Sequence, residues 1–129
     1  MKKHLTNIQV RFSDTDLIGH LNNTSYATYA ETARIHFFRD TKVNLSKMIL
    51  ANISIDFRYQ AKYHQPMVVE SSILKIGNTS IKLYQKMLSA DTMAAEVTSV
   101  VVCFDYTNNQ PIPVPDEMRT VLENYLIKE

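Results

Sequence analysis

The feature that most constrains the fold is a long alternation of side chains between residues 49 and 59. Apolar residues occupy every second position, from Ile49 to Tyr59, and mostly polar residues stand between them. This period of two predicts a long β-strand with one buried face. A strand of this length needs neighbours, so the rest of the chain must supply a sheet.

Three further strands are predicted after this one. They are separated by short segments that have the composition of turns, and strands joined by such short loops lie antiparallel. The predicted strands are 67–76, 80–88 and 93–104, and the turns are Gly77-Asn78 and Ala90-Asp91-Thr92.

Two helices and one more strand complete the prediction. Apolar side chains at steps of three and four residues, from Tyr26 to Phe37, predict a helix that ends near Asp40-Thr41. Asn22, Asn23 or Thr24 can cap its start, and a short alternating strand over residues 7–12 precedes it. Asp116 can cap a last helix. The order strand, long helix, four strands and helix predicts an α+β domain whose sheet packs on one helix.

Composition excludes several classes of function. The 129 residues suit one domain, and a formal net charge of +1 gives no basis for binding nucleic acid or an anionic membrane. Neither a signal peptide nor a membrane-spanning segment is evident. The single cysteine, Cys103, lies in an apolar run, and the four histidines match no zinc-binding spacing. We therefore expect a cytoplasmic protein without a metal site.

The polar segment before the long helix carries the chemistry. It contains Asp14, Asp16, Gly19 and His20, followed directly by the expected start of the helix. Backbone N–H groups at a helix N-terminus have no intrahelical partner and carry partial positive charge, so they can stabilise a developing anion. A carboxylate beside such donors suits hydrolysis of an activated acyl compound. Gly19 suits a backbone with positive φ or a close approach to a ligand.

The pattern Asp14-Thr15-Asp16-x-x-Gly19-His20-x-Asn22-Asn23-x-x-Tyr26, with Glu31-x-Ala33-Arg34 after it, resembles the 4-hydroxybenzoyl-CoA thioesterase-like family. The Gly-His-x-Asn-Asn form is closest to the bacterial long-chain acyl-CoA thioesterase branch. The resemblance implies that residues 1–129 form a single hotdog thioesterase domain. In this fold a curved antiparallel sheet of about five strands wraps around a long central helix. Glu31 and Arg34 can also pair along that helix.

The resemblance implies a role for each matched position. Asp16 would act as nucleophile or general base, and Asn23 would offer its backbone N–H to the thioester oxygen. His20 would hold the loop or the substrate carbonyl. The positions that would shape the substrate site are Gly19, Asn22 and Tyr26.

The resemblance implies an acyl-CoA thioesterase that releases coenzyme A and a fatty or aromatic acid, with no cofactor. It also implies a homodimer or homotetramer with sheets joined edge to edge and active sites between subunits. Two alternatives stay open, a thioesterase for acyl-carrier-protein substrates and a non-catalytic acyl-CoA-binding hotdog protein.

Overall fold

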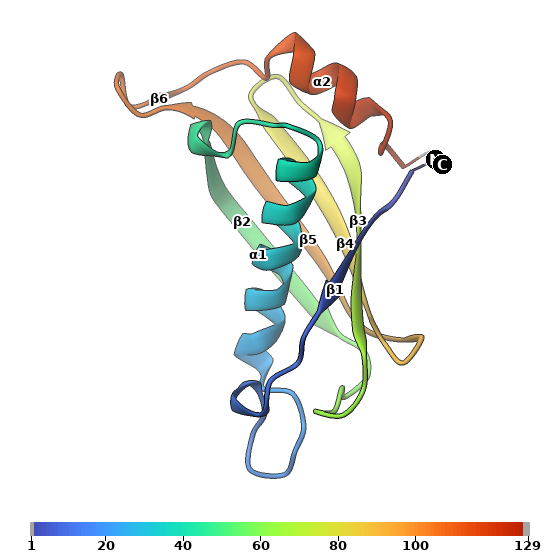
Figure 1. The fold of residues 1–129 in the computed structure, drawn as a ribbon. Coiled ribbons are helices and arrows are strands. Elements are labelled where there is room, and N and C mark those ends of the chain that lie inside the picture. Colours follow the sequence, from blue (N-terminus) through green and yellow to red (C-terminus); the bar gives the residue numbers. More distant parts are fainter. Residues whose placement is uncertain (1, 128–129) are drawn as a thin grey trace.

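The computed structural model describes residues 2–127 of the chain (Figure 1). Within these residues, two helices and six strands make up the regular structure, together with two short 3₁₀ turns at Phe12–Asp14 and Leu45–Lys47. The elements are β1 (His4–Ile8), α1 (Asn23–Asp40), β2 (Met48–Phe57), β3 (Met67–Ile76), β4 (Ser80–Ser89), β5 (Thr92–Asp105), β6 (Gln110–Pro111) and α2 (Asp116–Glu123).

The sheet has the order β1-β3-β4-β5-β2, and every neighbouring pair is antiparallel. The two-residue strand β6 pairs with the end of β5. The sheet curves around α1, and α2 packs at the opposite end from the start of α1 (Figure 1). This arrangement confirms the α+β hotdog fold, with five main strands around a central helix and a short C-terminal helix.

Most predicted boundaries hold to within a residue or two, and two details were wrong. The first strand covers His4–Ile8 rather than 7–12, because its partner β3 begins at Met67, which pairs with Ile8. Phe12 instead enters a 3₁₀ turn and is exposed. The N-cap of α2 is Pro115, and Asp116 is the first helical residue.

The buried apolar side chains form two clusters along α1. One surrounds the start of the helix and includes Tyr26 and Tyr29, and the other surrounds its end and includes Phe37 and Leu122. Gln85 lies fully buried beneath the middle of the helix, where its Nε2 donates to the Ala30 carbonyl at 3.1 Å. Close approach of this kind is possible because Ala30 and Ala33 carry small side chains.

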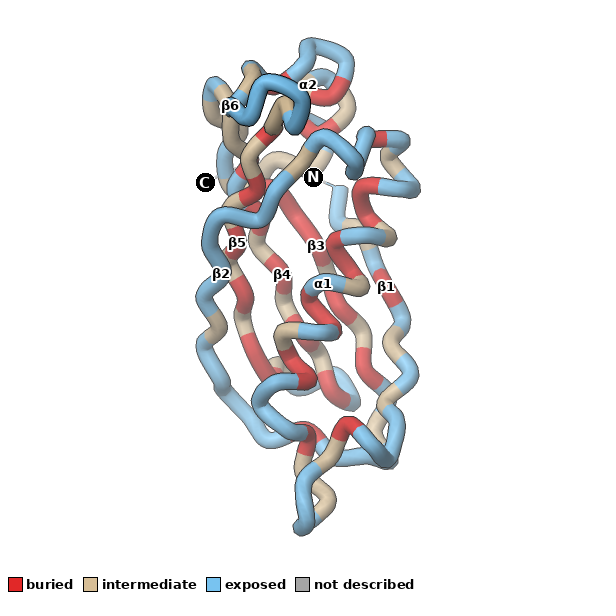
Figure 2. Tube along the Cα trace, turned by 90° about the vertical axis from the view of Figure 1, so that its left-hand side faces the viewer, coloured by how far each residue is buried: buried red, intermediate tan, exposed pale blue. Residues whose placement is uncertain are grey.

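The predicted buried face of β2 was wrong in this structure. Ile49 is 40% exposed and Phe57 is 49% exposed, and most of the strand lies open (Figure 2). The cause is position, because β2 is an edge strand that pairs only with β5 within residues 2–127. Its alternating apolar face therefore has neighbours on one side only.

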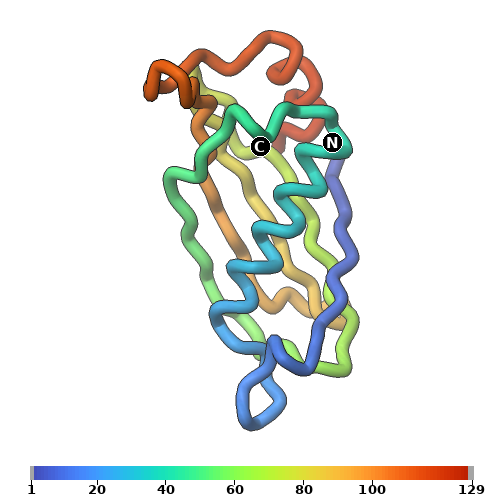
Figure 3. The backbone as a smooth tube through the Cα atoms, turned by 60° about the vertical axis from the view of Figure 1, so that its left-hand side comes forward, coloured from blue at the N-terminus to red at the C-terminus, as the bar shows by residue number. Residues whose placement is uncertain are grey.

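The path of β2 brings two distant parts of the sequence together. The helix α1 has 18 residues and is about 27 Å long, and the 10 residues of β2 return over about 33 Å. The end of β2 consequently lies near the start of α1 (Figure 3). This end of the molecule holds the polar segment identified from the sequence.

Candidate active site

The start of α1 is capped by Asn22, one of the three residues that the sequence offered. Its Oδ1 accepts hydrogen bonds from the backbone N–H of Thr24 at 3.1 Å and from the Thr24 hydroxyl at 3.0 Å. Asn23 is then the first residue of the helix, and its N–H donates no hydrogen bond within residues 2–127. An N–H group in this position is available to an incoming oxygen atom.

The segment between residues 14 and 22 is a closed loop that is fixed at its base. The Asp14 carbonyl accepts from the Asn22 N–H and from the Ser25 hydroxyl, both at 2.9 Å. Inside the loop, the Asp16 N–H donates to the His20 carbonyl at 2.8 Å. The Leu21 N–H donates to the Ala61 carbonyl at 2.8 Å, which ties the loop to the chain after β2.

Asp14 is the buried carboxylate of this segment and serves the loop's structure. Its Oδ2 accepts from the Tyr29 hydroxyl at 2.7 Å and from the Arg11 N–H at 3.1 Å, and its Oδ1 accepts from Arg11 Nη2 at 3.1 Å. Burial alone raises the pKa of Asp14, but these hydrogen bonds outweigh it and hold the pKa below its usual value. Burial and the neighbouring carboxylate raise the pKa of Tyr29. Asp14 therefore stays ionised and bonded.

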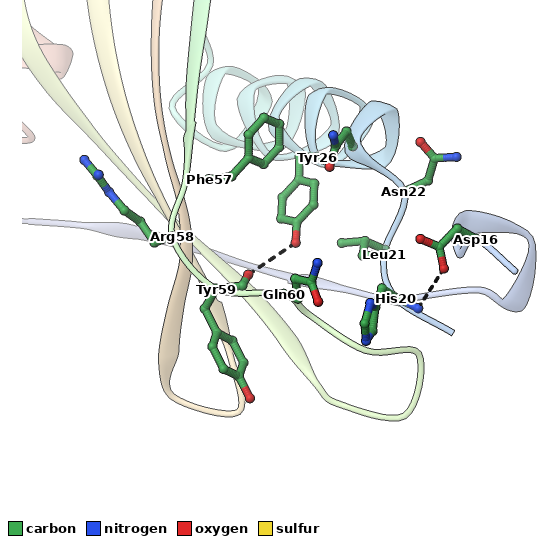
Figure 4. A pocket seen from close by; sticks show the side chains of 10 residues that line it. Asp16, His20, Leu21, Asn22, Tyr26, Phe57, Arg58, Tyr59 and Gln60 are labelled. Atoms are coloured by element: carbon green, nitrogen blue, oxygen red, sulfur yellow. Dashed lines mark hydrogen bonds between the residues drawn. The ribbon is translucent and has the colours of Figure 1, made fainter. Parts of the chain in front are cut away.

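Asp16 lies exposed on the loop, and its side chain lines a cavity (Figure 4). Its Oδ1 accepts from the backbone N–H groups of Ile18 at 3.0 Å and His20 at 3.1 Å. The other oxygen, Oδ2, accepts no hydrogen bond within the described residues. The carboxylate is thus oriented by the loop through one oxygen, while the second can meet a substrate or a water molecule.

His20 and Gly19 complete the loop. The His20 side chain lines the same cavity, and its buried Nδ1 has no partner in the part of the chain that the structure describes. The hydrogen bonds between His20 and Asp16 use the backbone N–H and carbonyl of His20 and not its ring. Gly19 has a φ of 80°, as the sequence suggested, and it lies beside the cavity without lining it.

Tyr26 joins the first turn of α1 to the segment after β2. Its hydroxyl lies 3.5 Å from the Tyr59 carbonyl and accepts from the Ala61 N–H at 3.3 Å. Its ring meets the Phe57 ring edge to face, with 5.1 Å between the centroids. The buried Tyr26 side chain therefore fixes one wall of the cavity.

The cavity has a volume of about 520 Å³. It brings together the predicted residues Asp16, His20, Asn22, Asn23 and Tyr26, and it adds five that sequence reasoning did not place there: Leu21, Phe57, Arg58, Tyr59 and Gln60. The signal for the last four was available, because a strand that follows a long helix and matches its length returns to the start of that helix. Arg58 forms an ion pair with Glu96, in which Arg58 Nη2 and Glu96 Oε2 lie 2.8 Å apart.

Two properties of the described chain bear on cofactors and membranes. Residues 2–127 contain no group of three or more His, Cys, Asp or Glu side chains placed to hold a metal ion. No helix among them is both long enough and apolar enough to cross a bilayer.

Comparisons with known proteins bear on the fold and on the family of this chain. A Bacillus stearothermophilus structure described as a predicted thioesterase superposes with a TM-score of 0.91 at 29% identity, covering 99% of each chain. A thioesterase from Thermus thermophilus, complexed with coenzyme A and Zn, gives a TM-score of 0.86 at 22% identity, over 94% of this chain and 92% of that chain. The second likeness, at this identity, shows a shared fold.

Among sequences, YsmA of Bacillus subtilis (strain 168) is 28% identical over 83 residues, which are 60% of this chain. The match spans 55% of the length of YsmA. The model of the Thioesterase-like superfamily matches residues 10–122, nearly the whole chain and all of the loop and cavity described above. The chain belongs to the Thioesterase-like superfamily.

Proposed function

We propose that the protein is an acyl-CoA thioesterase that uses Asp16 to hydrolyse its substrate. The thioester carbonyl sits at the start of α1, where the Asn23 N–H stabilises the oxyanion. His20 holds the loop or the carbonyl, and Gly19, Asn22 and Tyr26 shape the site. The observation that carries this proposal is the cavity that Asp16 and Asn23 both line, together with the Asn23 N–H, which donates no hydrogen bond within residues 2–127.

Two routes are open to the Asp16 carboxylate. In the first, an oxygen of Asp16 attacks the thioester carbon, the C–S bond breaks and coenzyme A leaves as a thiolate; water then hydrolyses the mixed anhydride and supplies the proton that the thiolate takes up. In the second, Asp16 takes a proton from water while the water oxygen attacks the same carbon; the C–S bond breaks, and the proton passes from Asp16 to the departing thiolate. Charge develops on the carbonyl oxygen in both, so a fixed N–H donor lowers the barrier in both.

The proposal extends to the substrate of the protein and to its assembly. We place the protein with the long-chain acyl-CoA branch, acting in the cytoplasm on fatty or aromatic acyl groups, with no cofactor beyond the coenzyme A of the substrate. Two or four copies join their sheets edge to edge, with active sites between subunits. The open edge of β2 supports this assembly, since unpaired strand edges readily pair with another chain.

The test is thiol release from a panel of acyl-CoA thioesters, short, long and aromatic, by the purified protein. We expect release from at least one, and a loss of about 100-fold or more in kcat for Asp16→Asn. Asp116→Asn is the matched control, because Asp116 begins α2 at the far end of the fold. This control should retain full activity.

The outcomes separate the alternatives. Thiol release from acyl-carrier-protein thioesters alone would identify that substrate class instead. Acyl-CoA compounds that raise the melting temperature without being consumed would identify a binding protein. Full activity in Asp16→Asn would reject the assigned role of Asp16.

A further inference from the structure

Arg34 is a buried cation without an ion-pair partner among the described residues. It lies on α1 with only 8% of its surface exposed, and its Nη1 makes no hydrogen bond within residues 2–127. The expected pair with Glu31 on the same helix is not formed, because no oxygen of Glu31 lies within 4.0 Å of the guanidinium. Burial lowers the pKa of Arg34, and Glu31 only partly opposes this effect.

A buried charge without a partner is unfavourable, so proteins normally neutralise such groups with an opposite charge. Arg34 lines a groove of about 300 Å³ between α1 and β2, together with the exposed side chains Glu31, Ile35, Ile49 and Leu50. The groove is therefore mainly apolar and open to the surface, and it contains one exposed carboxylate and one guanidinium that forms no ion pair within the described chain.

The groove between α1 and β2 lies beside the unpaired edge of β2. The strand β2 forms its ladder with β5 on one side and with no other strand in the described chain (Figure 2). If two copies of β2 pair antiparallel about a two-fold axis, the two copies of α1 lie antiparallel on the same face of the joined sheet. The side of α1 that faces β2 then faces the other copy.

The positions of Glu31 and Arg34 along α1 make their charges complementary between two copies of the helix. Glu31 lies at the middle of α1 and Arg34 lies less than one turn beyond it. When two antiparallel copies meet near their midpoints, residue 31 of each stands opposite residue 34 of the other. In a two-fold contact every pair occurs twice, so both arginines gain a carboxylate at once.

We propose that Arg34 forms a reciprocal ion pair with Glu31 of the partner subunit, which closes the α1–β2 groove between two copies of this chain. The inference rests on the assembly proposed above and does not depend on hydrolysis. It names the contact that joins the helices, in addition to the strand edges.

Charge reversal tests the pairing directly. In Glu31→Arg, positions 31 and 34 are both cationic, and in Arg34→Glu both are anionic. Each variant alone should self-associate roughly 100-fold more weakly than the wild type, since like charges would meet across the axis. Mixing the two variants should restore assembly, because every facing pair is then of opposite charge. The double variant E31R/R34E should also assemble alone.

Sedimentation velocity gives the association constants, and native mass spectrometry of a mass-labelled mixture identifies the mixed species. Circular dichroism reports folding of each variant. If a reversal unfolds the chain, Glu31→Gln replaces it, because Glu31 is exposed; this variant should weaken assembly about ten-fold. The proposal would be overturned by a single reversal that assembles with wild-type affinity, or by the absence of a mixed species. It would also be overturned by a monomeric wild type, or by unchanged affinity in Glu31→Gln. The readout is mass, so a failure of the thioesterase proposal would be seen separately.

Discussion

Replacing Tyr29 with Phe should destabilise the fold by removing one hydrogen bond to a buried carboxylate. The Tyr29 side chain is 4% exposed, and its hydroxyl donates to Asp14 Oδ2 at 2.7 Å. Hydrogen bonds to charged groups contribute about 1.5–3 kcal/mol net, and Arg11 retains its own bonds to the carboxylate. We expect Tyr29→Phe to lower the free energy of unfolding by about 2 kcal/mol at pH 7. The melting temperature should fall by roughly 6–8 °C.

The effect should depend on pH with a definite sign. The folded state holds the pKa of Asp14 below its ordinary value, so the ionised carboxylate stabilises the protein above the unfolded pKa, about 3.9. This stabilisation is lost as the pH falls through the lower folded pKa. The difference in unfolding free energy between the wild type and Tyr29→Phe should therefore have its full value at pH 7 and become smaller below about pH 4.

Urea unfolding followed by circular dichroism at pH 7 and at pH 3 measures both quantities. Tyr63→Phe is the control, because Tyr63 is 48% exposed; it should change stability by less than about 0.5 kcal/mol. An equal loss at both pH values, or none at pH 7, would refute the reasoning. Asp14 also fixes the base of the loop that carries Asp16. We therefore expect Tyr29→Phe to lower kcat by a larger factor than it changes KM.

Three further predictions test other parts of the structure. Gly19→Ala should cost about 1 kcal/mol of unfolding free energy through its positive φ alone, because nothing lies within 4 Å of an added Cβ; a loss above about 3 kcal/mol would contradict this. Phe37→Ala should cost about 3–5 kcal/mol in the same urea assay, because the ring is fully buried; a loss below about 1 kcal/mol would contradict its packing. Cys103 is 1% exposed and burial raises its pKa, so the native protein should react with a thiol reagent far more slowly than the urea-unfolded chain. Equal rates in the two states would be inconsistent with that burial.

The sequence predicted the helix and the hairpins well because their signals are local. The period of α1 and the cap candidates near Asn22 are contained in one short segment, and the turn after Ser89 uses positive φ at Ala90 and Asp91. The loop that carries Asp16 was also identifiable, since two carboxylates, a glycine and a histidine stand together directly before the helix.

The features that the sequence did not predict depend on distant partners. The end of β1 is set by the start of β3, so the alternation through Phe12 could not locate it. The exposure of β2 follows from its edge position, which the apolar pattern does not encode. The wall formed by Phe57 and Tyr59 follows from topology, and the isolation of Arg34 within the described chain follows from which face of α1 meets β2.

The division of the core into two clusters has a consequence for how such a chain can change. The cluster at the start of α1 supports the cavity, and a separate set of apolar residues anchors α2 at the other end. Substitutions around Leu122 can therefore accumulate without moving the walls that Tyr26 supports. Thermal stability can therefore change through substitutions around Leu122 while the cavity at the start of α1 keeps its shape.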